Sequence, residues 1–391
     1  MGATCSSANA VDMGGKNSKD SGAFDSIEED ARRGSKESVS NGGRNVKGEN
    51  PYSNVSTGTA SHTNDVASDD SSTKKLVPTH KDAVNDIVLH VGQSKTTPTL
   101  LTCSDDKSIA LQALGSTEDA AKRWSGHSKP VNKVVCNENF IFSCSRDLKI
   151  KQWVVDSPDA CATYEGHTLT VTALGIRSDG TRIASGSRDT TIRVWDVATG
   201  KQRARNSTPR NLVTCLQWFP DNSSLLAQGS EDLSLRIWDV RTSVVKASQT
   251  FKGYVYFPLC LDISPDGNEI LTGSKGFNGV GCEVRVWDVR AGKVRLELNG
   301  HEQDVKACKF LTESPGRVIT GSKDKTVRVW NIASGANGSS RMVHNYKMYG
   351  DGAFAAMCVV GQQAQENATV VYTGAALDGT PEMFSACIPC F

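Results

Sequence analysis

The sequence lacks the features that mark membrane-spanning, secreted and nucleic-acid-binding proteins. No run of roughly 18 or more apolar residues is present, so a membrane-spanning helix is not expected. No apolar core follows Met1, so a cleavable secretion signal is not expected either. Charge of one sign is not in excess, because 44 basic side chains stand against 43 acidic ones. A general nucleic-acid binder is normally clearly basic, and we expect no nucleic-acid partner.

Groups that hold metals or cofactors are scarce as well. Cys387 and Cys390 form a lone C-x-x-C pair, with no second pair and no histidine at metal-ligand spacing. Other cysteines, such as Cys103 and Cys215, lie inside apolar strand-like runs, which is typical of reduced core thiols in a cytosolic protein. The sequence therefore predicts no metal ion and no cofactor.

The first part of the chain also lacks a hydrophobic core. Residues 1–74 are rich in serine, glycine, asparagine and aspartate, and large apolar residues such as Phe24 and Tyr52 are isolated. Such a segment cannot bury enough surface to offset the entropy lost on ordering, so we expect it to be disordered.

The amino terminus carries a possible lipid anchor. The opening MGATCS fits the N-myristoylation pattern, with Gly2 as the acylated residue and Ser6 at the required distance. One myristoyl chain anchors only weakly, and Cys5 is placed to take a palmitoyl chain as the second signal. This pattern predicts a cytoplasmic protein held at the cytoplasmic face of a membrane; the alternative is a chance Met-Gly start.

From about Leu76 onward, apolar runs of four to eight residues recur between Gly, Asp, Pro and Ser, a pattern typical of short β-strands. Self-comparison shows repeats: SGSRDTTIRVWD at Ser185 resembles SCSRDLKIKQWV, QGSEDLSLRIWD and TGSKDKTVRVWN. A damaged copy begins at Thr272 and a fainter one at Thr102. The tryptophans that end the copies are Trp153, Trp195, Trp238, Trp287 and Trp330.

A Gly-His pair precedes several copies, at Gly126-His127, Gly166-His167 and Gly300-His301, and His80 takes the same place in the first. Repeats that start near Gly-His and end in Trp-Asp resemble the WD-repeat family. The resemblance implies an all-β, seven-bladed β-propeller over residues 75–391. Its repeats start near residues 80, 126, 166, 208, 253, 300 and 349. It also implies that residues 74–79 supply the fourth strand of the last blade and close the ring.

The repeated polar residues match the family's structural tetrad, in which histidine bridges a turn aspartate and a strand serine that bonds the tryptophan. Three full sets are expected: His127, Ser143, Asp147 and Trp153; His167, Ser185, Asp189 and Trp195; His301, Thr320, Asp324 and Trp330. A single Ser-His-Asp set resembles a catalytic triad. Because the set recurs, and threonine replaces serine once, we interpret it as a structural brace and expect no enzymatic activity.

Some repeats depart from the pattern. Repeat 1 has Gln112 in place of tryptophan, and repeat 4 has Pro209 and Gln228 in place of histidine and serine. Repeat 5 has Tyr254 for histidine and Gly276 for aspartate. We expect blades 1, 4, 5 and 7 to be less rigid than blades 2, 3 and 6.

The resemblance places candidate binding residues on one face of the ring, called the top face. The residue before the turn aspartate points there; in blade order these are Asp105, Arg146, Arg188, Glu231, Lys275 and Lys323. Loops between blades add Lys129, Arg210, Tyr256 and Phe257. Arginine and lysine beside aromatics suit protein or peptide ligands that are acidic or phosphorylated. The alternative is a set of solvated turn charges.

Two further motifs leave alternatives open. The glycine-rich Gly273–Gly281 resembles a phosphate cradle superficially, but no Lys-Ser follows, so a long top-face loop is expected. Trp-Asp-Val-Arg occurs twice, ending at Arg241 and Arg290. It resembles the signature of propellers that dock on the adaptor of a cullin–RING ubiquitin ligase. The leading hypothesis is a membrane-tethered, protein-binding scaffold; the alternatives are a ubiquitin-ligase substrate receptor and a structural subunit of a trafficking or transport assembly.

Overall fold

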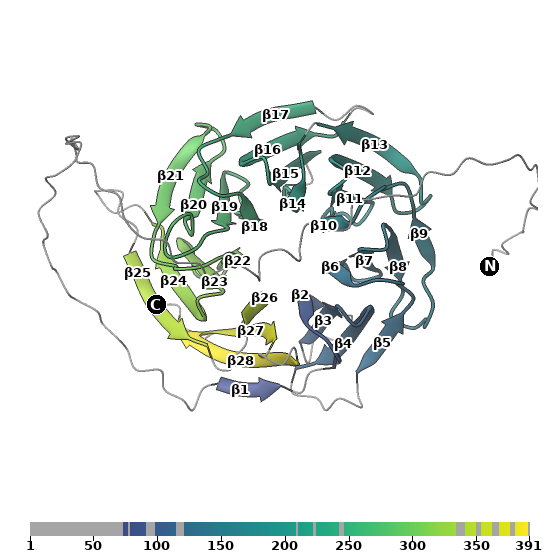
Figure 1. The fold of residues 1–391 in the computed structure, drawn as a ribbon, viewed down its shortest axis with the longest axis horizontal. Coiled ribbons are helices and arrows are strands. Elements are labelled where there is room, and N and C mark those ends of the chain that lie inside the picture. The colour runs from purple at the N-terminus through teal and green to yellow at the C-terminus, as the bar shows by residue number, and fades with distance from the viewer. Residues whose placement is uncertain are drawn as a thin grey trace, which may run out of the picture. The chain divides into compact units, whose positions relative to one another are not determined.

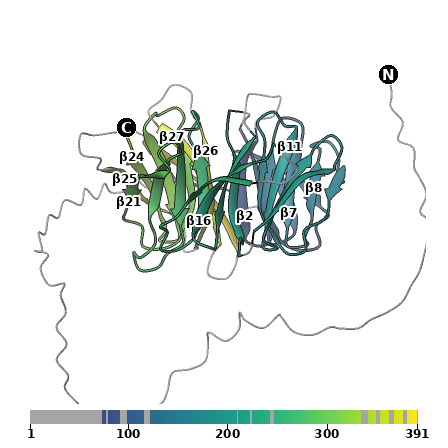
Figure 2. The same cartoon turned by 90° about the horizontal axis from the view of Figure 1, so that it is seen from above.

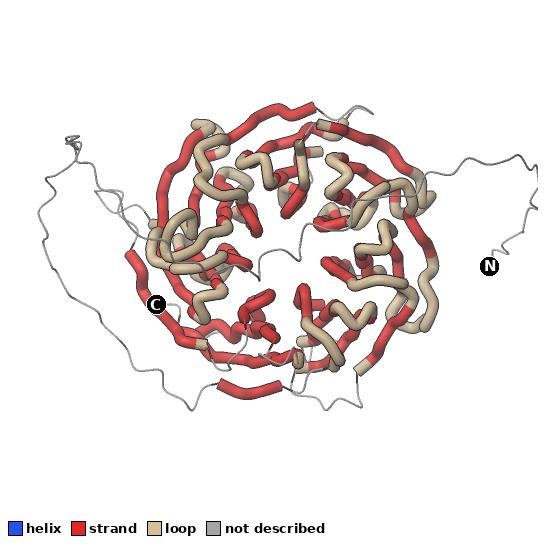
Figure 3. Tube along the Cα trace, viewed as in Figure 1, coloured by secondary structure: helices blue, strands red, loops and turns tan. Residues whose placement is uncertain are grey.

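The computed structural model describes residues 73–76, 79–90, 98–114, 121–208, 210–221, 224–241, 246–333, 341–348, 353–361, 367–375 and 380–389. These residues belong to one structural unit, Thr63–Phe391. Their regular structure consists of strands, arranged as seven four-stranded antiparallel sheets. Figure 3 shows no helix in this described part of the chain, and so none that could cross a membrane.

The strands follow one another blade by blade. Blade 1 contains β2 (Val84–His90), β3 (Thr99–Ser104), β4 (Ser108–Ala113) and β5 (Lys122–Ser125). Blade 2 contains β6 (Val131–Cys136), β7 (Ile141–Ser145), β8 (Ile150–Trp153) and β9 (Ala162–Tyr164). Blade 3 contains β10 (Val171–Ile176), β11 (Arg182–Ser187), β12 (Thr191–Asp196) and β13 (Gln202–Ser207). Blade 4 contains β14 (Val213–Trp218), β15 (Leu225–Ser230), β16 (Ser234–Asp239) and β17 (Lys246–Phe251).

The remaining blades complete the ring. Blade 5 contains β18 (Pro258–Ile263), β19 (Glu269–Ser274), β20 (Val284–Asp288) and β21 (Lys293–Leu298). Blade 6 contains β22 (Val305–Phe310), β23 (Arg317–Ser322), β24 (Thr326–Asn331) and β25 (Arg341–Lys347). Blade 7 contains β26 (Ala353–Val360), β27 (Asn367–Ala375), β28 (Pro381–Pro389) and β1 (Thr73–Leu76).

The seven sheets stand around a central axis as a β-propeller (Figure 1). The first strand of each blade faces the axis and the fourth lies at the rim. Figure 2 shows the ring edge-on, with loops collected on its two faces. The top face is the one that carries the turns between the second and third strands. The predicted all-β, seven-bladed fold is confirmed.

The ring closes through strands from opposite ends of the propeller sequence. β1 pairs antiparallel with β28, with Thr73 opposite Ala386 and Leu76 opposite Met383. Lys75 adds an ion pair to Glu382, at 3.3 Å. The closing strand covers Thr73–Leu76, which is shorter and begins one residue earlier than the 74–79 segment expected from the sequence.

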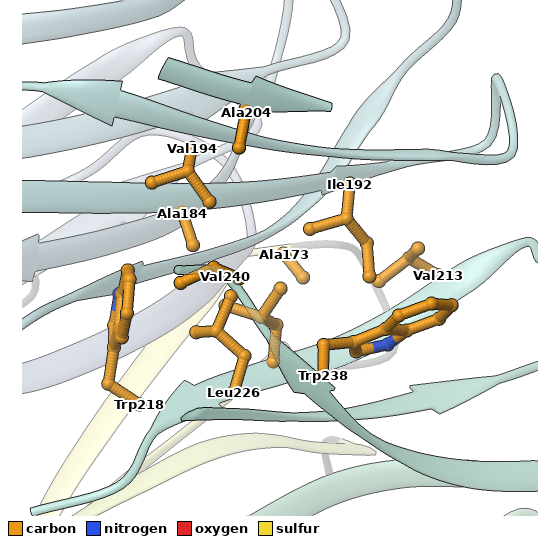
Figure 4. Close-up of a cluster of buried hydrophobic side chains, with 11 residues drawn as sticks. Ala173, Ala184, Ile192, Val194, Ala204, Val213, Trp218, Leu226, Trp238 and Val240 are labelled. Carbon is orange, nitrogen blue, oxygen red and sulfur yellow. The ribbon is translucent and has the colours of Figure 1, made fainter. Parts of the chain in front are cut away.

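The hydrophobic core is divided into seven layers, each between two adjacent blades. Figure 4 shows the layer between blades 3 and 4, where Ile192 and Val194 face Val213, Leu226 and Trp238. A small antiparallel sheet has two faces and cannot bury both alone, so each sheet packs between two neighbours. The final layer joins blade 7 to blade 1 and includes Val371, Met383 and Leu100. Ring closure therefore buries apolar surface as well as pairing backbone groups.

A β-bulge interrupts the innermost strand of every blade and turns one residue toward its neighbour. In blades 1 to 4, the bulged residue donates to a backbone carbonyl of the next blade. The four bonds are Asn85 to Val131 (2.8 Å), Asn132 to Val171 (2.8 Å), Thr172 to Val213 (2.5 Å) and Thr214 to Pro258 (2.6 Å). The equivalent residues in blades 5, 6 and 7 are Leu259, Lys306 and Ala355.

Candidate functional site

Blade 3 contains the polar set that resembled a catalytic triad. His167 Nδ1 lies 2.8 Å from Asp189 Oδ2, and His167 Nε2 lies 2.8 Å from Ser185 Oγ. The indole Nε1 of Trp195 donates to the same Ser185 oxygen at 2.9 Å. The serine is fully buried and its oxygen is engaged twice, so no substrate reaches it. The arrangement is a brace between a turn and a strand.

The turn aspartate anchors the brace because it accepts several hydrogen bonds. Asp189 Oδ1 accepts from the Thr191 amide and hydroxyl, and Oδ2 accepts from the Thr168 amide as well as from His167. Burial alone would raise the pKa of Asp189, but the bonds from His167 and Thr191 outweigh it and hold the pKa well below its usual range. A charged Asp189 favours the neutral histidine tautomer with its proton on Nδ1, which leaves Nε2 to accept the Ser185 proton.

The same geometry recurs in blades 2 and 6. His127 lies 2.8 Å from both Asp147 and Ser143, and Trp153 donates to Ser143 at 2.9 Å. His301 lies 2.8 Å from both Asp324 and Thr320, and Trp330 donates to Thr320 at 2.8 Å. The structure thus contains every bond of the three predicted tetrads.

Blade 1 keeps three parts of the brace. His80 lies 3.0 Å from Asp106 and 2.9 Å from Thr102, as expected from its place in the repeat. Gln112, which stands where tryptophan was expected, is buried on β4 opposite Leu100 of β3.

Blades 4 and 5 replace the brace with other residues. In blade 4, Gln228 accepts from Trp238 and donates to Asn211, each at 3.0 Å, and Arg236 also donates to Asn211. In blade 5, Thr272 accepts from Trp287 at 3.0 Å and lies 3.0 Å from the Tyr254 hydroxyl. Each tryptophan N–H is therefore satisfied. Because other residues replace the missing bonds, the missing tetrad residues alone do not imply that these two blades are less rigid. Their lower rigidity stays a prediction that hydrogen exchange can test.

The candidate binding residues share one backbone position on the top face. The residue before the turn aspartate, or before Gly276 in blade 5, donates its amide to a loop between blades. The bonds run from Asp105 to Ala83, Arg146 to Pro130, Arg188 to Thr170, Glu231 to Leu212, Lys275 to Phe257 and Lys323 to Asp304. The bonds are 2.9 to 3.0 Å long, so the six residues occupy equivalent positions on the top face. Arg146, Arg188 and Lys275 are exposed, and Lys323 is half-buried.

The charges at this top-face position are partly neutralised by nearby carboxylates. Arg146 lies 3.8 Å from Asp105, and Arg188 lies 3.7 Å from Glu231. Lys323 forms a 3.0 Å ion pair with the mostly buried Asp304. Lys275 instead places its ammonium over the Phe257 ring, 5.2 Å from the ring centre. This top-face position therefore carries both signs of charge, as its residue types indicated, and three of its four basic side chains lie near a carboxylate.

Comparison with known proteins identifies the repeats. A family model described as WD domain, G-beta repeat matches residues 120–154, 159–196, 203–239, 246–288 and 292–331. The chain belongs to the WD40-repeat family.

Curated proteins similar to this WD40 chain include human pre-mRNA-processing factor 17, 32% identical over 53% of this chain and 28% of the relative. Nuclear distribution protein nudF of Aspergillus niger is 26% identical over 66% of this chain and 52% of its own length. The CCR4-associated factor 4 homolog of Candida glabrata is 29% identical over 61% of this chain and 36% of its own. The chain therefore spans between about a quarter and about half of these relatives.

The glycine-rich segment of the WD40 propeller forms a hairpin between β19 and β20, in the loop position expected from the sequence. Phe277 and Val280 exchange backbone hydrogen bonds of 3.0 and 3.1 Å across Asn278 and Gly279. Both central residues have positive φ, 51° and 76°, as a type I′ turn requires. Phe277 and Val280 were not among the predicted site residues. The Asn-Gly dipeptide between apolar residues was the sequence signal that could have revealed them.

The other predicted top-face residues lie as follows. Tyr256 is 42% exposed, and Phe257 is half-buried under Lys275. Lys129 and Arg210 are exposed in loops that precede β6 and β14.

The two Trp-Asp-Val-Arg arginines lie on the opposite face of the WD40 propeller, just beyond β16 and β20. Both arginines are exposed. Arg241 also donates from Nε to Asp239 Oδ2 at 2.9 Å. Gly2 and Cys5, the predicted acylation sites, lie outside the described residues, as does Cys390.

A central cavity of about 1350 Å³ runs along the axis, lined by the first strands of the blades. Two ion pairs along its wall join adjacent blades: Lys133 pairs with Asp86 at 2.8 Å, and Lys309 pairs with Asp262 at 2.9 Å. Burial raises the pKa of the lining thiols Cys136 and Cys215 to about 12, so both stay protonated and unreactive. Among the described residues, no cluster of three metal-ligating side chains is present.

The tetrads make the stability of the WD40 propeller sensitive to acid. Burial lowers the pKa of His167 and His301 below 6.5, although their aspartates oppose this shift. Below about pH 6.5 the unfolded chain therefore binds more protons, and each histidine removes at most about 1.4 kcal/mol of stability per pH unit as pH falls. The depressed pKa of Asp324 adds a further loss below about pH 4.

Urea unfolding between about pH 7.5 and about pH 5 measures this effect. A double variant, His167→Gln with His301→Gln, should be less stable at neutral pH and show a flatter pH dependence. A double variant with the same slope as the original chain would contradict the assignment.

Proposed function

We propose that the protein is a non-enzymatic scaffold that binds protein or peptide partners through the loop faces of its propeller. The observation that carries this proposal is the division of labour within each turn. In blades 1, 2, 3 and 6 the turn aspartate is bonded within the brace. The residue before it, and its equivalents in blades 4 and 5, hold one backbone position with Asp, Arg, Glu or Lys side chains. A position that is fixed in space and variable in chemistry suits partner recognition.

Proximity labelling tests the scaffold and separates its two faces. A top-face variant, Arg146→Glu with Arg188→Glu, is compared with a bottom-face variant, Arg241→Glu with Arg290→Glu. All four side chains are exposed, so both variants should fold. Loss of labelled partners from the top-face variant supports the proposal. An unchanged partner set in both variants contradicts it.

The bottom-face variant also tests the second candidate function. The observation that favours a ubiquitin-ligase substrate receptor is the exposure of both Arg241 and Arg290. Loss of a cullin–RING adaptor from that variant alone would support it. Membership of a large trafficking or transport assembly predicts instead that the native protein elutes from size exclusion far above its monomer mass of 41.9 kDa.

The acidic or phosphorylated ligand is the finer part of this proposal. Arg146 and Arg188 already face Asp105 and Glu231, so an anionic ligand there must compete with these carboxylates. Binding of acidic peptides that survives Arg146→Ala with Arg188→Ala would exclude these two arginines as the anion site.

We further propose that acylation of Gly2 and Cys5 holds the scaffold at the cytoplasmic face of a membrane. The support is the MGATCS motif and the requirement for two acyl chains in stable anchoring. Cells fed a myristate analogue should label the original chain and not Gly2→Ala, and Cys5→Ser should move the protein from membrane to soluble fractions. Absence of label on the original chain would contradict tethering by this motif.

A further inference from the structure

Exposed apolar side chains concentrate on the top of blade 5. Val255 is 50% exposed, Tyr256 42%, Phe277 67% and Val280 57%. Together they are half of the large apolar residues that are exposed in the described part of the chain, and we call them the blade-5 patch. Scattered single apolar residues are ordinary on a protein surface, whereas a contiguous group marks a contact site.

The blade-5 patch is held in place rather than loosely displayed. The hairpin that carries Phe277 and Val280 pairs with the loop before blade 6, through a bridge from Phe277 to Gln303 and a 3.0 Å bond from the Gly279 amide to Glu302. Tyr256 packs directly on Gly281, where a Cβ would meet its ring at 2.1 Å. A rigid surface of this kind loses little entropy when it binds a ligand.

Three lysines border the patch and form what we call the lysine cluster: Lys275, Lys306 and Lys323. Lys323 forms an ion pair with the carboxylate of Asp304. Lys275 has the Phe257 ring below it, and neither Lys275 nor Lys306 forms an ion pair with any described residue. The cluster therefore keeps positive charge without compensation.

Lys306 is the unusual member because of its position. It occupies the bulge site at which Asn85, Asn132, Thr172 and Thr214 bind the next blade in blades 1 to 4. Its side chain instead is half-buried and lines the central cavity, as do Leu259 and Phe257. Burial lowers the pKa of Lys306, and the charges of Lys323 and Lys275 add to this shift while Asp304 opposes it. A carboxylate placed beside Lys306 would favour its charged form and so offset the lowering of its pKa.

We propose that the blade-5 patch and the lysine cluster together bind a peptide segment of a partner protein that carries a bulky apolar side chain next to carboxylates. The apolar side chain lies against Phe277 and Tyr256, and the carboxylates reach Lys275 at the surface and Lys306 at the cavity mouth. The recessed Lys306 favours an extended peptide over a membrane surface, because a flat lipid layer does not enter the cavity. This inference rests on the proposed scaffold function and assigns its ligand chemistry to blades 5 and 6.

The test uses fluorescence anisotropy with the full chain and three labelled synthetic peptides. The first peptide has one phenylalanine, one leucine and four glutamates in a glycine–serine background. The second replaces the glutamates with glutamines, and the third replaces the phenylalanine and leucine with serines. We expect the first to bind at least about tenfold more tightly than either control, since both kinds of contact contribute. Binding should also weaken as salt is raised.

Variants at matched positions localise the binding. Tyr256→Ser, Phe277→Ser and Lys306→Gln should each weaken the first peptide at least about tenfold. Leu169→Ser and Lys201→Gln are the controls: the Leu169 loop of blade 3 corresponds to the Tyr256 loop of blade 5, Leu169 is 53% exposed, and Lys201 is an exposed lysine between β12 and β13. These controls should bind as the original chain does, and equal melting temperatures show that each variant is folded.

Three outcomes would overturn the inference. They are no difference between the three peptides, equal losses in the patch and control variants, and binding of phosphatidylserine vesicles in place of peptide. If Arg188→Gln loses the peptide while Phe277→Ser keeps it, the scaffold proposal stands and this site is wrong. If proximity labelling also shows no dependence on either face, the scaffold proposal itself fails.

Discussion

Replacing Trp195 with alanine is expected to lower the free energy of unfolding by about 3–5 kcal/mol. Trp195 is 3% exposed and belongs to the core layer shared by blades 2 and 3. Its ring meets Tyr164 of blade 2 edge-on at 5.7 Å, and its N–H anchors Ser185. Removal leaves a cavity between two blades and takes one bond from the brace. Urea unfolding followed by far-ultraviolet circular dichroism measures the change.

The variant Trp195→Phe separates packing from hydrogen bonding. It keeps an aromatic ring in the layer and removes the donor, while Ser185 retains its bond to His167. Its cost should be close to that of one hydrogen bond, about 1 kcal/mol, together with the smaller ring's lost contacts. If Trp195→Ala costs no more than Trp195→Phe, the tryptophan does not hold the two blades together as described.

The substitution Gly321→Ala is expected to destabilise the contact between blades 6 and 7 by about 1–3 kcal/mol. A Cβ at Gly321 would meet the Phe354 ring at 2.3 Å, and Phe354 is a fully buried side chain at the start of β26. Gly186 has the same relation to Val213 at 2.2 Å. The glycine in the second strand is needed for space, because the next blade packs directly on its backbone.

A double-mutant cycle with Phe354→Ala tests this steric explanation. If the added methyl group clashes with the Phe354 ring, the double variant should be more stable than the sum of the single effects predicts, by more than about 0.5 kcal/mol. Strict additivity would show that Gly321→Ala acts somewhere other than this interface.

Much of the fold was predictable because it is repeated. The resemblance to the family's tetrad of histidine, serine, aspartate and tryptophan assigned each of these residues its bonds before any geometry was available. A loop was predicted for Gly273–Gly281 on separate grounds, because no Lys-Ser for phosphate binding followed it. Ring closure was predictable too, because the last repeat had three strands and an unused segment preceded the first.

Where a repeat departs from the pattern, the sequence showed which tetrad residues were missing but not which side chains replace their hydrogen bonds. Repeat 4 lacked its histidine and serine, but nothing in the pattern indicated that Gln228, Asn211 and Arg236 would meet. A substitute hydrogen bond depends on which side chains the neighbouring strands bring within reach, and the repeat pattern does not specify these side chains. The rim had the same limit, since the pairing of Arg146 with Asp105 crosses from one blade to the next.

The sequence alone determined the number of blades, the strand order and the residues of the three full tetrads. The periodicity of the copies indicates the blades and their strands, and the resemblance to the family's tetrad assigns the four residues of each set. Only the tertiary structure decided which charges are compensated and which surface is exposed. Lys275 and Arg188 hold equivalent positions, yet one faces an aromatic ring and the other a glutamate of the next blade. The contact of Lys275 lies within its own repeat, whereas that of Arg188 crosses to the next blade, which no single repeat encodes.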